Sequence, residues 1–557
     1  MSASAPGAEE LVFLPLGGAG EIGMNLNLYG WGPPGDRRWL MIDCGLGFNS
    51  NVVPGVDIVL PDPAYIAGQR GRLMGLVLTH AHEDHLGALP YLWPKLRCPV
   101  YATRFTRAMM RHKLRDGGAM AELQPMALPE NGRLQVGPFS LQLIGMTHSI
   151  PDAQAIVIRT PAATVLHTGD WKLDPDPVVG PTSDEVALRS LGDEGVDALV
   201  CDSTNVFVPG RTGSEASLQR DLHRLIASCR RRVVVTCFAS NIARIATIAT
   251  AAQAAGRVVL VSGGSLKRTC AAARECGYLG GLPPLLDDSL FGTLPAEKCL
   301  VVCTGGQGEP RAALSRIVQG EHPHVDLDPG DTVIFSTRVI PGNEIGIGRL
   351  YNALLRAGVA VLNHRDGDIH VSGHPARGDL EHMYALVRPK VAVPVHGELR
   401  HMLAHAELAS AAGVSERIVA ENGNIVRLAP GPACVVEKVT AGRLAVEGNR
   451  AVPMDGELVR NRVKAIYNGA ATVTVVLQKS RPAVRQVLLS CIGVVEQGED
   501  HIVQTMRQAV QEAVEELPAA RHEDEAAVAE VARIAVRRAA RQAIDKRPLV
   551  QVHVVRV

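Results

Sequence analysis

The sequence is poor in several features that mark particular classes of protein. The 557-residue chain has no run of about 18 apolar residues, the length that a membrane-spanning helix needs. Its first residues, MSASAPGAEELVFLPLGG, lack the basic start and the following apolar stretch of a secretory signal peptide. We therefore expect a cytoplasmic protein that has no contact with a membrane.

The sequence also has no paired cysteine motif, few aromatic residues and no net charge. The 11 cysteines form no CxxC pair and no disulfide-like spacing, and Cys201 and Cys303 sit in apolar runs, so we expect reduced thiols in a core. Aromatic residues make up only 4%, which disfavours wide platforms for stacking bases. The 57 basic and 57 acidic residues cancel, which mildly opposes nucleic-acid binding, although a local positive groove is sufficient for it.

The length of 557 residues predicts two or three domains, because a single core stops growing at about 250–300 residues. Residues 1–212 contain short apolar runs that end in polar residues, which is typical of buried strands whose ends carry a site. Residues 213–366 alternate strand and helix patterns, as a parallel sheet does. Strands with polar ends return over 367–455, which finishes as a linker. The tail, 456–557, combines helical spacing with a last alternating strand.

The densest group of metal-binding residue types directly follows the apolar strand GLVL. In the string THAHEDH, His80, His82, Asp84 and His85 lie within six residues, so a tight loop at a strand end can turn them toward one point. Imidazole suits zinc, and a carboxylate can complete or bridge a site. One ion needs three or four ligands, so the group suggests two ions. The alternative reading is a solvated polar loop.

Further candidate ligands lie at the ends of other predicted strands. His148 follows LQLIGMT, Asp170 closes TVLHTGD, and His396 closes VAVPVH. Each of these residues alone could be a core histidine or a turn residue. Their joint occurrence with the THAHEDH string favours a shared metal site.

Seven residues can then be divided between two zinc ions. One ion is held by His80, His82 and His148, the other by Asp84, His85 and His396, and Asp170 bridges the two. Metals about 3.5–4 Å apart suit in-line displacement at phosphorus, and zinc lowers the pKa of the attacking water. Asp43, at the end of WLMID, is a candidate for orienting a ligand histidine. The predicted chemistry is therefore hydrolysis of a phosphodiester bond.

The order of Asp43, the HxHxDH cluster, His148 and Asp170 resembles the metallo-β-lactamase superfamily. The later strings DSTN, HVSGH and PVHGE look like motifs A, B and C of the β-CASP nucleases. Together with HTGDWKLD and FASNIARI, they resemble the bacterial ribonuclease J family. The resemblance covers residues 10–430 strongly and the tail weakly.

The resemblance implies a fold and an assembly. It implies an α/β protein, an αββα metallo-β-lactamase sandwich with a parallel-sheet β-CASP domain inserted over 213–366. A small α+β domain follows over 456–557 and supports a homodimer or a dimer of dimers. RNA would run between the lactamase and β-CASP domains, and a larger RNA-degradation complex is an implied partner.

The resemblance also implies roles for single residues. His374 would protonate the leaving oxygen, with Asp202 supporting a nearby histidine, and Asp84 and Asp43 complete the catalytic set. A pocket for an RNA 5′-monophosphate would be formed by Phe238, Ala239, Ser240, His370, Val371, Ser372, Gly373 and His374. It would favour 5′-to-3′ exonuclease action on single-stranded RNA, with endonuclease cleavage also expected, in RNA decay and rRNA processing. A histidine in motif C, His396, favours RNA over DNA.

Some family members bind a structural calcium after the first motif. Here the corresponding loop, Phe48–Pro54, contains no carboxylate, and the next one along the chain is Asp57. We therefore do not expect that calcium site. A basic row, Arg104, Arg107 and Arg111, shares one helix face and is either an RNA-guiding surface or a solvated face.

Three other functions remain open at this point. A DNA nuclease of the same fold would prefer DNA over matched RNA. A small-molecule hydrolase, such as a thioesterase or lactonase, would not need the long stretch between Asp170 and His396. A binding-only RNA scaffold would be expected to lack some metal ligands, and none of the seven is missing.

Overall fold

The computed structural model describes residues 9–48, 53–114, 122–129, 132–479 and 483–557. The chain divides into two compact units, Met1–Ser50 with Ile58–Gly442, and Asn51–Asp57 with Arg443–Val557. In the described residues no helix is long and apolar enough to cross a membrane. Residues 49–52 of the loop considered for calcium lie outside the described residues.

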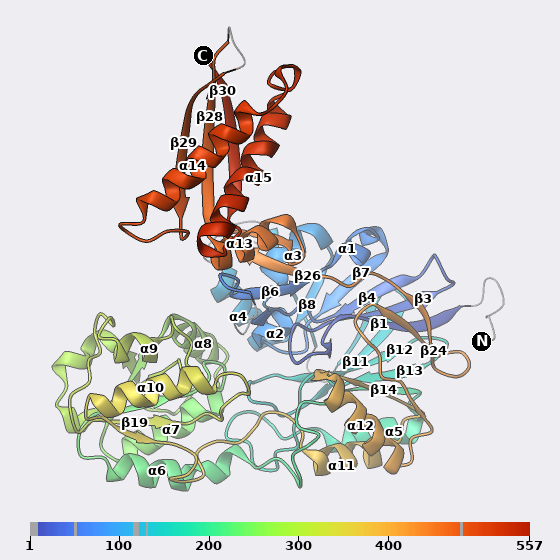
Figure 1. Ribbon diagram of the computed structural model, residues 1–557. Helices are drawn as coiled ribbons and strands as arrows, with labels where there is room; N and C mark the ends of the chain where they lie inside the picture. The colour runs from blue at the N-terminus through green and yellow to red at the C-terminus, as the bar shows by residue number, and fades with distance from the viewer. Residues whose placement is uncertain (1–8, 49–52, 115–121, 130–131, 480–482) are drawn as a thin grey trace. The chain divides into compact units, whose positions relative to one another are not determined.

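Two facing β-sheets form the centre of the first unit (Figure 1). The first sheet runs in the order β25 (Cys434–Lys438), β24 (Asn424–Ala429), β1 (Glu10–Gly17), β3 (Leu26–Gly32), β4 (Arg38–Ile42), β7 (Leu73–Val77), β8 (Val100–Ala102) and β9 (Met126–Ala127). The second runs β10 (Arg133–Val136), β11 (Phe139–Gly145), β12 (Gln154–Arg159), β13 (Thr164–His167), β14 (Ala198–Asp202), β21 (Val391–Val395) and β23 (Glu416–Arg417). One apolar core joins them, with Phe13 and Tyr29 from the first sheet and Ile156 and Val200 from the second.

Helices accompany both sheets. Near the first sheet in Figure 1 are α1 (Ala64–Ala67), α2 (Glu83–Leu86), α3 (Leu89–Leu96) and α4 (Arg104–Leu114). The outer face of the second packs on α5 (Glu185–Glu194), α11 (Arg377–Val387) and α12 (Leu399–Ala411), which share an apolar cluster with it. The short strands of this unit are β2 (Ala19–Gly20), β5 (Gly47–Phe48), β6 (Ile58–Pro61) and β22 (Gly397–Glu398).

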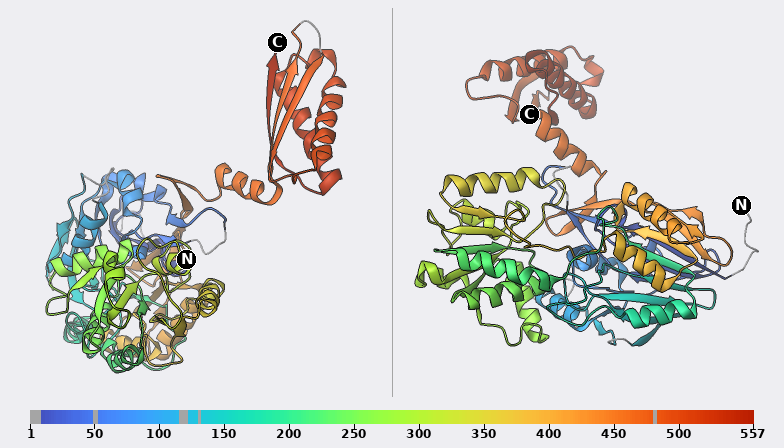
Figure 2. Two further views of the ribbon diagram at one scale, coloured as in Figure 1. Left: turned by 90° about the vertical axis from the view of Figure 1, so that its left-hand side faces the viewer. Right: turned by 90° about the horizontal axis from the view of Figure 1, so that it is seen from below.

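A six-stranded parallel sheet occupies the stretch between β14 and β21 in the chain. Its order is β17 (Leu285–Asp287), β16 (Val258–Ser262), β18 (Cys299–Cys303), β15 (Val233–Thr236), β19 (Thr332–Phe335) and β20 (Ala360–Leu362). Continuous apolar runs such as CLVVC suit strands that are covered on both faces. The helices that connect them are α6 (Gln219–Ser228), α7 (Ile242–Ala254), α8 (Gly264–Glu275), α9 (Ala313–Val318) and α10 (Glu344–Arg356) (Figure 2).

The second unit contains two short strands and a helix, followed by a small α+β domain. The two strands and the helix are β26 (Arg443–Glu447), β27 (Arg450–Pro453) and α13 (Glu457–Asn468). A sheet ordered β29 (Val484–Ile492), β28 (Ala470–Leu477) and β30 (Leu549–Arg556) then packs on α14 (Asp500–Glu515) and α15 (Glu525–Ile544). Met506 and Val510 of α14 and Val536 of α15 are fully buried, so the helical spacing seen in the sequence marks the face that contacts the sheet.

The predicted fold class is confirmed: two β-sheets that share one core, an inserted parallel sheet and a small C-terminal α+β domain. The boundaries assigned to the domains stay predictions.

Candidate metal centre and active site

The candidate ligands gather because parallel strands end at common edges of the two sheets. β4 and β7 are parallel neighbours, and they end just before Asp43 and the THAHEDH string. β13, β14 and β21 are likewise parallel neighbours, and Asp170, Asp202 and His396 lie at or just beyond their ends. The fold therefore brings residues far apart in the sequence to one place.

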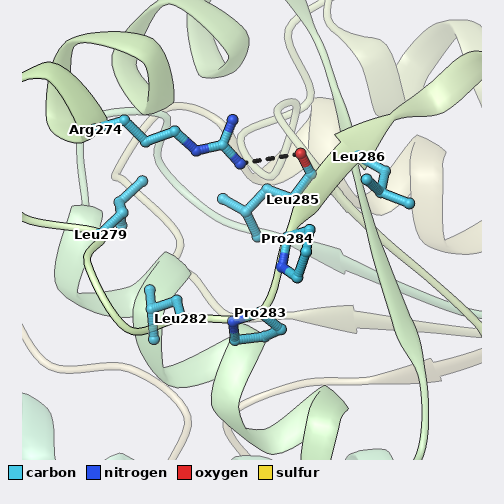
Figure 3. A pocket seen from close by; sticks show the side chains of 7 residues that line it. All are labelled: Arg274, Leu279, Leu282, Pro283, Pro284, Leu285 and Leu286. Carbon is cyan, nitrogen blue, oxygen red and sulfur yellow. Dashed lines mark hydrogen bonds between the residues drawn. The ribbon is translucent and has the colours of Figure 1, made fainter.

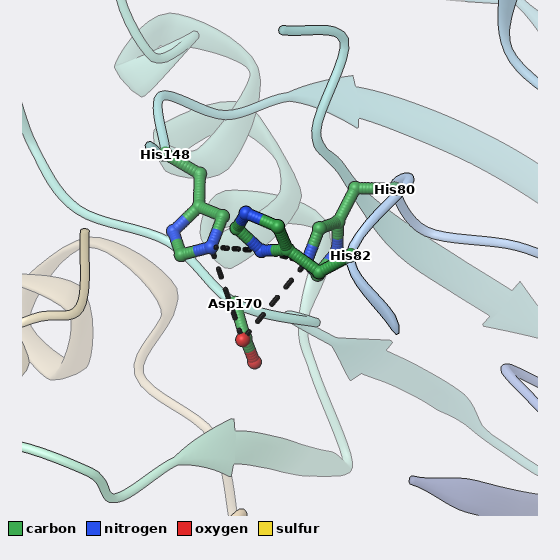
Figure 4. Close-up of side chains that lie close together, drawn as sticks. All are labelled: His80, His82, His148 and Asp170. Carbon is green, nitrogen blue, oxygen red and sulfur yellow. Dashed lines mark hydrogen bonds and ion pairs between the residues drawn. The ribbon is translucent and has the colours of Figure 1, made fainter. Parts of the chain in front are cut away.

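Three histidine rings form the first half of the cluster. Nε2 of His80 and Nε2 of His148 each lie 3.0 Å from Nδ1 of His82. The carboxylate of Asp170 faces the same group, with Oδ2 at 4.0 Å from His80 Nε2 and 3.9 Å from His148 Nε2 (Figure 4). Three nitrogens and one oxygen thus converge in a buried space.

The second half is formed by Asp84, His85 and His396. His85 Nε2 lies 3.6 Å from Asp84 Oδ2 and 3.1 Å from Asp170 Oδ2. His396 Nε2 lies 3.1 Å from Asp84 Oδ2. Because the same Asp170 oxygen faces both halves, this residue is placed as a bridge between them.

The donor set fits zinc. In a tetrahedral site with zinc–nitrogen bonds of about 2.0–2.1 Å, neighbouring ligand atoms lie roughly 3.3 Å apart. The nitrogen–nitrogen distances of 3.0 Å around His82 are close to that spacing. All seven predicted ligands are brought together, each with one ligand atom within 4.8 Å of the others in its group.

Each ligand histidine is held by a hydrogen bond at its other ring nitrogen. For His85 the partner is Asp43, whose Oδ2 lies 2.7 Å from Nδ1, while the same carboxylate accepts the Thr79 amide at 2.8 Å. For the other four rings the contacts are His80 Nδ1 with Thr79 Oγ1 (3.0 Å), His82 Nε2 with Ser240 Oγ (2.9 Å), His148 Nδ1 with the Gly373 carbonyl (2.6 Å), and His396 Nδ1 with Thr204 Oγ1 (2.8 Å). Such contacts fix which nitrogen faces a metal.

The electrostatics of the two halves differ. Burial holds the pKa of His80 and His148 well below the ordinary value and lowers the pKa of His82 to about 4, so these rings keep a lone pair free at neutral pH. Burial also disfavours charge on His85 and His396, but neighbouring carboxylates outweigh it and raise the pKa of both rings. A buried concentration of carboxylates that favours positive charge is suited to a dication.

His374 lies beside the cluster and is paired with Asp202. Its Nδ1 is 2.8 Å from Asp202 Oδ2 and 3.8 Å from Asp170 Oδ2. Burial opposes protonation, yet the two carboxylates prevail and raise the pKa of the His374 imidazole. Asp170, Asp202, His374 and His396 form a third close group of donors, so His374 is either a proton donor or a further ligand.

The residues predicted for the phosphate pocket come from two segments. Phe238, Ala239 and Ser240 follow β15, and Ser240 reaches His82. The segment His370–His374, which contains Val371, ends at His374 beside Asp202, and its Ser372 hydroxyl accepts the Asn205 amide at 2.8 Å. The buried Nδ1 of His370 has no hydrogen-bond partner among the described residues.

Sequence reasoning missed the hydroxyl residues of the site, Thr79 and Thr204. Thr79 directly precedes His80 in THAHEDH, and Thr204 follows Asp202 by two residues in DSTN. Their position next to a strand end was visible in the sequence. Their partners were not, because Thr204, for example, contacts His396 only in the folded chain, at a separation of 192 residues.

Two arginines of the basic row on α4 make contacts within the protein. Arg104 donates to the backbone carbonyl of Glu275 at 3.3 Å, and Arg111 pairs with the Glu275 carboxylate at the end of α8. These two arginines therefore link α4 to the parallel-sheet part.

A shallow pocket on the parallel-sheet part has none of this chemistry. It measures about 330 Å³ and is lined mostly by leucine and proline, such as Leu282 and Pro283 (Figure 3). Its arginine, Arg274, is already bonded to the Leu285 carbonyl at 3.0 Å. The metal cluster, and not this pocket, is the candidate active site.

Comparison with known proteins agrees with this geometry. Four family models match the chain: the metallo-β-lactamase superfamily over 31–202, the ribonuclease J β-CASP domain over 230–354, the zinc-dependent metallo-hydrolase RNA specificity domain over 365–420, and the ribonuclease J C-terminal domain over 457–557.

Full-length relatives are also similar. Ribonuclease J of Sinorhizobium meliloti is 45% identical over 99% of this chain and 98% of its own. Ribonuclease J of Mycolicibacterium smegmatis is 40% identical over 86% of this chain and 85% of its own. A crystal structure of a protein of unknown function from Enterococcus faecalis V583 covers 75% of this chain and 100% of its own with a TM-score of 0.52 and 18% identity, which supports the fold alone.

Proposed function

Because the chain belongs to the ribonuclease J family of β-CASP metallo-β-lactamases and is a metal-dependent ribonuclease, we propose that it is a two-zinc 5′-to-3′ exonuclease. It prefers single-stranded RNA with a 5′-monophosphate, and it also cuts internally. It acts in RNA decay and rRNA processing in the cytoplasm. The observation that carries the proposal is the convergence of two ligand groups on one Asp170 oxygen.

The seven ligand residues and their partners hold the reaction centre. When bound, zinc supplies Lewis acidity at the phosphate and a lower pKa for water. Asp43 orients His85 through the 2.7 Å contact, and Thr204 orients His396 through the 2.8 Å contact. These contacts keep the ring nitrogens aimed at the cluster before substrate arrives, so no reorganisation is needed during the reaction.

His374 is the proton donor to the leaving oxygen in this proposal. Asp202 accepts a hydrogen bond from Nδ1–H of His374, which leaves Nε2 free to face the substrate. Although burial opposes it, Asp202 and Asp170 raise the pKa of the His374 imidazole, which favours the protonated form that a general acid requires. Asp202 is itself held by the Thr204 amide at 2.8 Å, so the pair is rigid.

The 5′-monophosphate preference is supported by the chemistry of the two segments beside the cluster. Ser240 and Ser372 offer hydroxyl groups, and His370 offers a buried Nδ1 that has no hydrogen-bond partner within the described part of the chain. Phe238 is 37% exposed and provides a ring for one base. A terminal phosphate held there would place the first phosphodiester bond near the metals.

The test is digestion of one 3′-labelled RNA that carries a 5′-monophosphate, triphosphate or hydroxyl. We expect stepwise release of mononucleotides, fastest from the monophosphate form. Equal rates on the three RNAs would remove the pocket from the proposal. Faster cleavage of matched DNA would instead favour a DNA nuclease, and turnover of thioesters or lactones without RNA cleavage would favour a small-molecule hydrolase.

Assembly and domain limits complete the proposal. We infer a lactamase domain over 1–212 and 367–455, a β-CASP domain over 213–366, and a C-terminal domain over 456–557 that joins chains as a homodimer or a dimer of dimers. Light scattering of the full chain and of a chain ending at residue 455 tests this. A shorter chain that keeps the full-length oligomeric state would exclude the tail as the interface.

A further inference from the structure

One side of the His82 ring contacts a hydroxyl group outside the metal cluster. Ser240 Oγ lies 2.9 Å from His82 Nε2. On the opposite side of the ring, Nδ1 lies 3.0 Å from the Nε2 atoms of His80 and His148. The ring therefore has one nitrogen among the ligand atoms and the other on Ser240.

This geometry decides where the His82 proton lies when a metal is bound. A neutral imidazole carries one N–H and one lone pair. Because Nδ1 faces the other ligands, a metal held here would take the Nδ1 lone pair, which would leave the proton on Nε2. The Nε2–H group then donates to Ser240 Oγ.

Resting on the proposed function, we propose that Ser240 is a positioning residue of the metal centre that also couples it to the RNA phosphate. Its hydroxyl fixes the tautomer and orientation of His82 by accepting the Nε2–H bond. Outer partners of this kind typically account for about 10–100-fold in metal affinity. The loss of affinity should concern the metal held by His80, His82 and His148, because His82 belongs to that ligand group.

The origin of Ser240 sets it apart from the other outer partners. Thr79, Asp43, Thr204 and Gly373 hold the remaining rings and lie outside the segment matched by the β-CASP model. Ser240 lies inside that segment. The inserted domain thus contributes directly to the geometry of a metal ligand.

The loop that carries Ser240 is firmly held. The next residue, Asn241, caps α7 by accepting the Arg244 amide at 2.8 Å and donates to Glu215 at 3.0 Å. Arg244 is buried and makes a two-point contact with the Glu215 carboxylate at 3.1 and 3.0 Å. The Ser240 hydroxyl is therefore presented from a rigid support.

Ser240 can serve a phosphate at the same time. A hydroxyl group has one proton to donate and two lone pairs to accept with. While it accepts from His82, its own O–H remains for a phosphate oxygen of RNA in the proposed pocket. Binding of the phosphate and of the metal should then strengthen each other, and such coupling is reciprocal.

The experiment measures zinc affinity of the metal-stripped full chain by chelator competition, without RNA. We expect Ser240→Ala to lower the affinity for one of the zinc equivalents by about tenfold or more. Ser240→Thr, which keeps the hydroxyl, should bind as the wild type does, whereas the similarly shaped Ser240→Val should match Ser240→Ala. The control is Ser228→Ala on α6, whose hydroxyl bonds only to Leu225 of its own helix in the described contacts.

A second measurement follows the coordination directly. With cobalt in place of zinc, the visible spectrum of Ser240→Ala and Ser240→Val should differ from that of the wild type and Ser240→Thr. Wild-type zinc affinity and an unchanged cobalt spectrum in both hydroxyl-free variants would overturn the inference. That result would leave the proposed function standing, because the latter fails only if the zinc-loaded wild type does not cleave RNA.

Discussion

At the scale of single residues, both nitrogens of each ligand histidine have a partner. One nitrogen faces the cluster and the other meets a carboxylate, a hydroxyl or a carbonyl group. The arrangement explains why buried rings can be aligned before a metal arrives. It also makes the consequences of single substitutions specific.

Replacing a ligand should remove activity without unfolding the chain. His82→Ala and Asp84→Ala each delete one donor from a different half of the cluster. We expect RNA cleavage to be abolished while far-UV circular dichroism stays unchanged. Undiminished turnover in either variant would contradict the assignment of metal ligands.

His374→Ala separates proton donation from metal binding. Removing a general acid should slow cleavage by about 10²–10⁴-fold. Zinc content, measured by mass spectrometry, should stay at the wild-type level because His374 is not assigned as a ligand. Loss of zinc from this variant would show that the third donor group, and not a proton donor, is the correct description.

His405 should make the free energy of unfolding depend on pH, and this effect is separate from catalysis. Its buried ring lies 2.9 Å from both Ser203 Oγ and Tyr384 Oη, and burial lowers its pKa to about 4 although Asp202 opposes this. The unfolded ring titrates near 6.5, so this stability is complete above about pH 6.5 and is lost as pH falls toward 4.

The measurement is urea unfolding of the wild type and His405→Gln at pH 7 and pH 5. Relative to the variant, the wild type should lose about 1–2 kcal/mol between these values. Comparing the two chains cancels any loss of metal that both share. A constant difference between them would contradict the pKa shift.

At the scale of elements, the site is built where parallel strands end, at β4 and β7 in one sheet and at β13, β14 and β21 in the other. This could be predicted, because apolar runs that end in His or Asp are visible in the sequence. The contact of Ser240 with His82 could not, because the two residues are 158 positions apart and no local pattern links them. The role of Glu215 was missed for the same reason.

The start of α7 should depend on its buried ion pair. Arg244→Met leaves the Glu215 carboxylate, which is 3% exposed, without its guanidinium partner. Breaking such a pair costs about 3–5 kcal/mol of the free energy of unfolding. Arg220→Met on α6, whose side chain is 86% exposed, should change it by less than about 0.5 kcal/mol. Equal effects in urea unfolding would contradict this.

At the scale of the whole molecule, the centre needs segments from most of the first unit. Asp43 and His85 come before the parallel sheet in the chain, and His396 comes after it. The sequence could indicate the fold class through its order of motifs. It could not indicate which outer contacts cross from the inserted sheet to the ligands, since these depend on packing rather than on periodicity.

The most direct test of the central claim is to measure zinc content and RNA cleavage on the same sample before and after metal stripping. We predict two zinc ions per chain, loss of cleavage when both are removed, and recovery when zinc is restored. Purified enzyme that still cleaves 5′-monophosphorylated RNA after complete removal of metal would contradict the account.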